Sequence, residues 1–188
     1  MKRLEVLLRH IVINLLRLIS RKNKSTEISL NGNSKILFIR LNNIGDALVT
    51  TPLIKIIKKY TGAEIKIAVS KRNYFIFENN KNISEILLYN KSFSGFLKLL
   101  REINSNKFDC IIDTHTDISG TVSMLVALSK SPLKVCLQKD SASIYNIVAP
   151  YNAEDKNHII DKICNIANAL GIKYKDEDIK MEFEFKKE

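Results

Sequence analysis

The stretch KILFIRLNNIGDALVTTP, residues 35–52, decides the fold of this chain. It begins with a short apolar run, residues 36–41, of the kind found in β-strands that are buried on both faces. A polar turn around Gly45 follows, and apolar residues then recur at helical spacing as far as Ile57. A strand, a tight turn and a helix form the first half of a β-α-β unit. Ligands of such sheets bind beyond the carboxyl ends of the strands, so we expect Asp46 to stand at the ligand crevice.

Strand and helix patterns alternate along the rest of the chain, which predicts an α/β fold built on a parallel sheet. The pattern of residues 71–80 favours a short helix, and the apolar segment 145–149 is ambiguous. Met181, Phe183 and Phe185 alternate with glutamates in the charged tail, which indicates a further strand or an extended linker. The expected strands are 64–69, 86–89, 108–113 and 135–137, and the expected helices are 93–103, 118–129 and 157–170.

Composition bounds the class of protein. The chain has 188 residues, of which 45% are apolar and 27% charged, so it is long enough for one substantial domain and is not globally disordered. The net charge of +10 favours an anionic partner: nucleic acid, anionic lipid or phosphorylated sugar. Nucleic acid is the weakest of these because no aromatic and basic RNA-binding motif occurs. The three widely spaced cysteines predict reduced core thiols in a cytosolic protein.

Residues 1–24 form a separate element, which we predict to be a basic amphipathic helix. Apolar residues recur at three- and four-residue steps, and arginines and lysines surround them. Asn14 and Arg17 interrupt the apolar run, so it is too short to span a bilayer. We favour a helix at the membrane surface, and packing on the domain or on a partner protein stays open. The linker 25–34 follows, and the folded domain begins at Lys35. The apolar positions are Leu4, Leu7, Leu8, Ile11, Leu15, Leu18 and Ile19.

Asp46 is the first candidate for chemistry. A carboxylate at a strand-to-helix turn could take a proton from a sugar hydroxyl and make that oxygen a better nucleophile. The structural alternative is a cap on the helix that follows, a role that aspartate often fills. Thr50 and Thr51 precede Pro52, so Thr51 could cap a helix with proline at its first position; alternatively the helix starts at Asp46. Either way, free N–H groups would face the crevice and could hold a phosphate or a carboxylate.

A second group of polar residues, DTHTD at 113–117, follows the fourth expected strand. It should lie on the same sheet edge as Asp46, so Asp113 and His115 could line the same crevice. His115 could hydrogen-bond a sugar or phosphate. The structural alternative is a polar loop in which Thr116 or Asp117 caps the next helix. No ligand set has the spacing of a zinc site, and no GxSxG hydrolase elbow or GxxxxGK[ST] phosphate loop is present.

Three segments together resemble glycosyltransferase family 9, the ADP-heptose:lipopolysaccharide heptosyltransferases. They are ILFIRLNNIGDALVTTP at 36–52, FDCIIDTHTDISG at 108–120 and HIIDKICNIANALGI at 158–172. The first is the most specific. The resemblance implies a GT-B architecture in which residues 35–172 are the Rossmann-like N-terminal, acceptor-side domain.

The resemblance also implies a reaction. Asp46 would be the catalytic base of an inverting transfer from a nucleotide diphosphate sugar such as ADP-heptose to a lipopolysaccharide-core or other lipid-linked glycan. No metal or cofactor is expected. The implied location is cytoplasmic, peripheral on the inner face of the membrane. The expected acceptor- or phosphate-binding residues are Asn43, Gly45, Thr50, Thr51, Asp113 and His115.

The chain departs from the family in its C-terminal region. A family member has a second domain of similar size that holds most of the nucleotide-sugar site, whereas residues 173–188 read as a charged tail or the start of a linker to that domain. We therefore expect a truncated or split half-enzyme that does not turn over donor by itself. The alternative function is a non-catalytic, membrane-associated binding module derived from the same fold.

Overall fold

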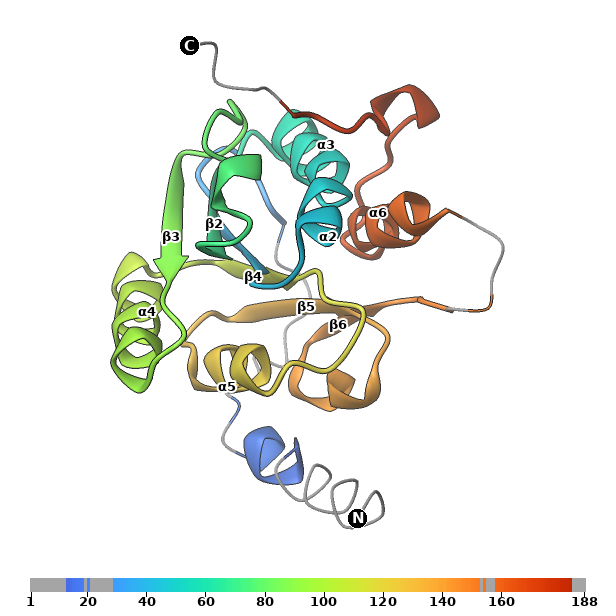
Figure 1. Ribbon diagram of the computed structural model, residues 1–188. Coiled ribbons are helices and arrows are strands. Elements are labelled where there is room, and N and C mark those ends of the chain that lie inside the picture. Colours follow the sequence, from blue (N-terminus) through green and yellow to red (C-terminus); the bar gives the residue numbers. More distant parts are fainter. Residues whose placement is uncertain (1–12, 19, 21–28, 153, 155–157, 184–188) are drawn as a thin grey trace.

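The computed structural model describes residues 13–18, 20, 29–152, 154 and 158–183 (Figure 1). Strands and helices alternate along the chain, as the sequence predicts. The strands are β1 (Lys35–Arg40), β2 (Glu64–Ser70), β3 (Glu85–Tyr89), β4 (Cys110–Asp113), β5 (Leu133–Leu137) and β6 (Ile147–Ala149). The α-helices are α2 (Ile44–Leu48), α3 (Thr51–Thr61), α4 (Phe93–Asn106), α5 (Gly120–Leu128) and α6 (Ile159–Ala169), and the short 3-10 helices are η1 (Tyr74–Ile76), η2 (Asp140–Ile144) and η3 (Asp176–Asp178).

The six strands form one parallel sheet in the order β3-β2-β1-β4-β5-β6. The chain proceeds outward from β1 to β3, then returns to the other side of β1 and proceeds outward again to β6. The order therefore reverses between β1 and β4, where Ile39 pairs with Asp113. In open α/β sheets the ligand crevice lies at such a switch point, beyond the carboxyl ends of the strands. The α/β class and the Rossmann-like sheet are confirmed.

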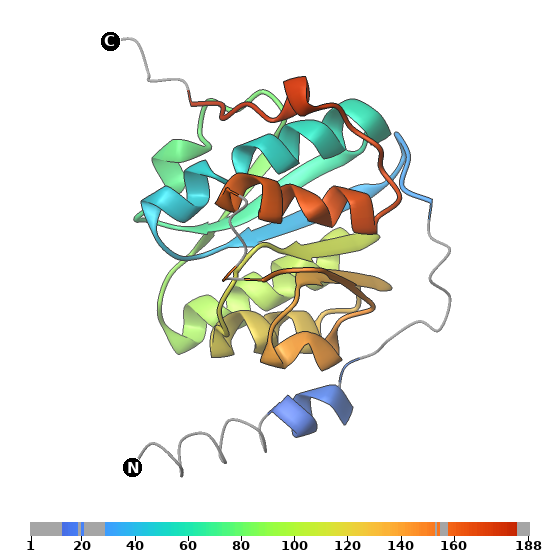
Figure 2. The same cartoon turned by 90° about the vertical axis from the view of Figure 1, so that its right-hand side faces the viewer.

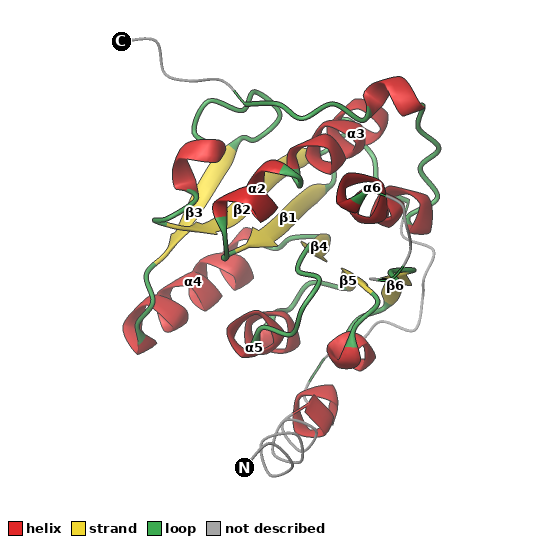
Figure 3. Cartoon of the chain, turned by 45° about the vertical axis from the view of Figure 1, so that its right-hand side comes forward, coloured by secondary structure: helices red, strands yellow, loops and turns green. Residues whose placement is uncertain are grey.

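Helices cover both faces of the sheet, with α2, α3 and α6 on one side and α4 and α5 on the other (Figure 3). Successive residues of a strand point to opposite faces, so β1 contributes Phe38 to one core layer and Leu37 and Ile39 to the other. All three side chains are fully buried, which explains why β1 is apolar without alternation.

Two local predictions were wrong. Residues 71–80 contain only the single turn η1, because the buried Asn73 side chain accepts bonds from Ser70 and donates to the carbonyl of Arg40, which holds the chain in a turn. Helix α5 is capped by Ser119, whose hydroxyl accepts the Val122 N–H, so neither Thr116 nor Asp117 is its cap.

The turn after β1 resolves the open question of where its helix starts. Two helices follow rather than one: α2 contains Asp46 in its first turn, and α3 begins at Thr51 with Pro52 in its first turn. Thr50 occupies the N-cap position of α3, but its hydroxyl donates to the carbonyl of Asp46 instead of accepting from the helix.

The terminal segments lie partly outside the described residues. Of residues 1–24, only 13–18 and 20 are described; residues 13–18 are helical and lie beside the α5 and η2 side of the domain (Figure 2). Residues 179–183 form neither helix nor strand, so within the described part of the tail the predicted further strand is absent. Among the described residues no helix is both long enough and apolar enough to cross a membrane.

Candidate functional site

Asp46 stands at the switch point with 43% of its side chain exposed. One carboxylate oxygen, Oδ2, receives both contacts from the protein: Arg40 Nη2 lies 3.0 Å away and Asn43 Nδ2 donates across 3.2 Å. Within the described residues nothing bonds to the other oxygen, Oδ1. The carboxylate is therefore fixed through one oxygen while the second is free to accept a proton from a ligand.

Arg40 is the residue that fixes Asp46, and it is itself buried, with 1% exposure. It ends β1, and its Nη1 donates across 2.5 Å to the carbonyl of Thr114, just beyond the end of β4. Burial lowers the pKa of the guanidinium, and the carboxylates of Asp46, Asp113 and Asp117 oppose that shift. Since arginine starts from a very high pKa, Arg40 remains a cation.

Asp113, the last residue of β4, is the centre of a buried polar cluster. Its Oδ1 accepts from the backbone and ring of His115, and its Oδ2 accepts from Lys139 Nζ at 2.6 Å and the Tyr145 hydroxyl at 2.5 Å. Burial by itself would raise the pKa of Asp113, but the charge of Lys139 and the His115 contacts hold that pKa well below its ordinary value. Burial and the Asp113 charge raise the pKa of Tyr145, which stays protonated as a donor.

His115 joins this cluster to β1. Its Nδ1 lies 2.7 Å from Asp113 Oδ1, and its Nε2 accepts the Leu41 N–H at 3.3 Å. An accepting Nε2 needs a lone pair, so this geometry assigns the ring proton to Nδ1 in a neutral imidazole. The ring is completely buried. His115 therefore positions the start of the turn after β1.

A second clamp holds the same turn from the β2 side. Asn73 is fully buried, and its amide donates to the carbonyls of Arg40 and Asn42. The next residue, Asn43, has a positive φ of 24°, which is uncommon outside glycine. Strained backbone of this kind persists when the surroundings determine it, and it clusters at functional sites.

A cavity of about 340 Å³ opens beside this turn, at the carboxyl ends of β1, β2 and β3. Asn43, which bonds to Asp46, is part of its wall, and its cationic groups are Lys71, Arg72 and Lys91. A second cavity of about 540 Å³ adjoins it through shared residues such as Leu41 and Tyr89, and this one has the apolar wall of Phe93, Phe96 and Met124. The crevice is thus basic at one end and apolar at the other.

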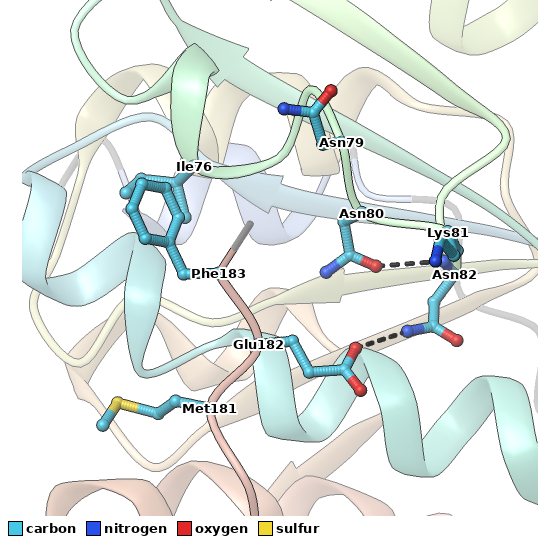
Figure 4. Close-up of a pocket in the computed structure, with 8 residues that line it drawn as sticks. All are labelled: Ile76, Asn79, Asn80, Lys81, Asn82, Met181, Glu182 and Phe183. Atoms are coloured by element: carbon cyan, nitrogen blue, oxygen red, sulfur yellow. Dashed lines mark hydrogen bonds between the residues drawn. The ribbon is translucent and has the colours of Figure 1, made fainter. Parts of the chain in front are cut away.

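A separate cavity of about 490 Å³ lies between the tail and the turn before β3 (Figure 4). Its carboxylate, Glu182, already accepts from Asn82 and pairs with Lys55. None of the residues that the sequence predicted for the site line this cavity. We therefore assign the candidate site to the crevice at the carboxyl ends of β1, β2 and β3, where Asn43 contacts Asp46. The cavity at the tail is nevertheless larger than the basic cavity of this crevice.

The same fold occurs in solved glycosyltransferases. A family 9 glycosyltransferase from Veillonella parvula superposes with a TM-score of 0.71 at 22% identity, over 85% of this chain and 47% of that one. The E. coli heptosyltransferase WaaC with ADP gives 0.63 at 13% identity, over 76% and 49%. The E. coli ADP-heptose lps heptosyltransferase II gives 0.63 at 15% identity, over 80% and 45%.

The fold is that of the family 9 glycosyltransferases. The resemblance inferred from three sequence segments is thereby confirmed at the level of structure. The chain spans about half the length of these solved enzymes. Neither a family model nor a curated protein sequence matches it.

Within this family 9 fold, the predicted site residues divide into two groups. Asn43 lines the basic cavity, and Gly45 and Asp46 follow it in the first turn of α2, with Asn43 and Gly45 exposed. Thr50 and Thr51 are buried, and their hydroxyls donate to backbone carbonyls. Asp113 and His115 are also buried, which corrects the expectation that they line the crevice. Lys139 and Tyr145, from the segment after β5, occupy the hydrogen-bonding positions of Asp113 that a ligand would need.

Sequence reasoning missed the cationic residues of the site. Arg40 is the charged residue at the end of an otherwise apolar strand. A charge at the buried end of such a strand needs an anionic or hydrogen-bonding partner, so its position in the sequence could have indicated a role at the site. Lys71, Arg72 and Lys91 follow the ends of β2 and β3, but only the sheet order places them together. The described residues contain no group of three or more His, Cys, Asp and Glu side chains suited to a metal ion.

Proposed function

We propose that this chain is a family 9 glycosyltransferase domain in which Asp46 is the general base. The observation that carries the proposal is the Asp46 carboxylate, held through Oδ2 with Oδ1 free at the switch point of the sheet. The glycosyltransferase fold supports it. A sugar hydroxyl bonded to Oδ1 would be oriented and partly deprotonated for attack.

The proposed reaction is an inverting sugar transfer. Asp46 Oδ1 takes the proton of the acceptor hydroxyl as that oxygen forms a bond to the anomeric carbon of the donor. The bond between the anomeric carbon and the nucleotide diphosphate breaks, and the diphosphate leaves with the electron pair. Arg40 keeps the carboxylate oriented during the transfer. A structure of WaaC is described with ADP-2-deoxy-2-fluoro heptose, which supports ADP-heptose as the donor to test first.

We propose the crevice as the acceptor site. Lys71, Arg72 and Lys91 give it the charge that an anionic saccharide needs, and the apolar wall at Phe93 and Phe96 suits the lipid of a lipid-linked glycan. A lipopolysaccharide-core acceptor has both features. Cys110, Cys136 and Cys164 are buried thiols that form no disulfide, which fits a reducing cytoplasm.

Calorimetric titration of the purified chain tests the assignment. We expect saturable binding of a deacylated lipopolysaccharide-core oligosaccharide, weakened about tenfold or more in Lys71→Gln/Arg72→Gln. Lys98→Gln/Arg101→Gln, on the outer part of α4, is the matched charge control and should bind as the parent does. Binding of ADP at Lys71 and Arg72, without binding of the oligosaccharide, would refute the acceptor assignment.

A second candidate is a non-catalytic glycan-binding module. One observation favours it: the Asp46 carboxylate already has a cationic partner, Arg40, as a purely structural ion pair would. Asp46→Asn separates the two functions, because it keeps the shape of the side chain and removes the base. Under the transferase proposal this variant binds the oligosaccharide normally. The rate of sugar transfer, measured with donor, acceptor and a donor-binding domain present, falls about a hundredfold or more. Unchanged transfer with Asp46→Asn would favour the module.

A further inference from the structure

The helix at residues 13–18 uses only one of its faces to contact the domain. Ile13 and Leu16 are buried, with 6% and 7% exposure, and Leu16 joins the core layer that contains α4 and α5 residues. Ser20 fixes the end of this segment, since its hydroxyl donates to the Ile144 carbonyl and accepts from the buried Lys134 Nζ. The helix is therefore attached in a defined orientation.

The opposite face is apolar and exposed. Leu15 is 56% exposed and Leu18 is 83% exposed. In the sequence, Leu4, Leu8 and Ile11 precede Leu15 at the three- and four-residue steps of the same helical stripe. Leu15 and Leu18, which the domain leaves uncovered, thus belong to the apolar face recognised in the sequence. The helix contacts the domain through Ile13 and Leu16 instead.

We propose that this outer face, defined by Leu15 and Leu18, binds the surface of an anionic lipid bilayer. Charge decides the partner: seven of the first 24 residues are Lys or Arg and only one is acidic. A helix with an apolar stripe and surrounding cations is typical of one that lies in the membrane interface, where each cation near anionic lipid adds to the attraction. This surface belongs to a part of the chain outside the three family 9 segments, and the inference does not depend on the proposed transferase activity.

The attachment of the helix has a consequence. Ile13, Leu16 and Ser20 fix the helix to the domain. Binding of its outer face to a membrane would therefore orient the whole domain on that membrane rather than tether it loosely. The membrane surface would then lie on the side of the sheet that carries α5 and η2, where residues 13–18 are seen (Figure 2).

Vesicle flotation of the full chain tests this. The probes are vesicles of phosphatidylcholine alone and vesicles that also contain phosphatidylglycerol; neither carries saccharide or nucleotide sugar, so the result is independent of the proposed function. We expect binding to the anionic vesicles that decreases with added salt. Leu15→Ser/Leu18→Ser should weaken it about tenfold or more, because two exposed leucines no longer enter the interface.

The matched control is Phe75→Ser/Met181→Ser, which removes two apolar side chains of 42% and 51% exposure from η1 and the tail. It should bind as the parent chain does. Leu15→Ser/Leu18→Ser should unfold like the parent because both leucines are more than half exposed, whereas the control also loses the edge contact between the Phe75 and Phe183 rings and should unfold slightly earlier. Equal binding by Leu15→Ser/Leu18→Ser and the parent would overturn the proposal. Absence of vesicle binding by the parent would also overturn it. A third contrary result would be a parent chain that sediments as a dimer and a Leu15→Ser/Leu18→Ser variant that sediments as a monomer, because the outer face would then be a contact between two copies.

Discussion

Replacing Lys139 with methionine removes the cation that lies 2.6 Å from the Asp113 carboxylate, in a place where water cannot substitute for it. The two side chains are 3% and 1% exposed. Breaking a buried ion pair by removing one partner costs about 3–5 kcal/mol, because the remaining charge is left uncompensated. Tyr145 and His115 still donate to Asp113, so we expect the lower end, about 3 kcal/mol, at neutral pH.

The cost should depend on pH, and its sign follows from the pKa of Asp113. That pKa is depressed in the folded protein, so ionised Asp113 stabilises the fold above its unfolded pKa of about 4, and this stabilisation is lost as pH falls toward the folded pKa. In Lys139→Met the main opposing charge is gone, and burial pushes the pKa of Asp113 upward. The difference in free energy of unfolding between parent and variant should therefore be largest at neutral pH and shrink below about pH 4.

Urea unfolding of the parent, Lys139→Met, Asp113→Asn and the double variant measures this. The double variant has no buried charge in the pair, so its loss should be smaller than the sum of the single losses by about 1–3 kcal/mol. Lys98→Met, whose side chain is 72% exposed in a surface pair with Glu102, is the control and should cost less than about 1 kcal/mol. A loss below about 1 kcal/mol for Lys139→Met, or a loss that is the same at neutral pH and at about pH 3, would refute this account of the cluster.

Two further predictions concern the loop before α4 and the docking of the tail. In Gly95→Ala the new Cβ would lie 2.1 Å from the backbone oxygen of Asn90, so thermal unfolding should show that the free energy of unfolding falls by about 1–3 kcal/mol. The control Gly120→Ala places its Cβ where no atom lies within 4 Å, and it should be neutral or slightly stabilising. Equal effects of the two substitutions would contradict the steric explanation. Bonds from Lys59 and Tyr60 lower the pKa of Asp178 to about 2, so tail docking should be intact above about pH 4 and lost as pH falls toward 2; NMR signals of Tyr60 that do not change over this range would count against it.

The amino-acid sequence by itself determined the α/β class and the approximate positions of the strands. These properties are local, because buried parallel strands need continuous apolar runs such as residues 36–41. The same local logic placed Asp46 in the strand-to-helix connection that follows β1. It failed at residues 71–80 and at the cap of α5, where one side chain, Asn73 or Ser119, decided the backbone.

Only the tertiary structure decided which polar residues face a ligand. Asp113 and Asp46 look alike in the sequence, since Asp113 ends an apolar strand and Asp46 is the first acidic residue after one. The fold places Lys139 and Tyr145 over one and leaves an oxygen of the other free. Those partners are 26 and 32 residues away from Asp113, and no local pattern specifies such contacts. The outward orientation of Leu15 and Leu18 has the same origin, because it depends on which face of their helix the distant η2 segment holds.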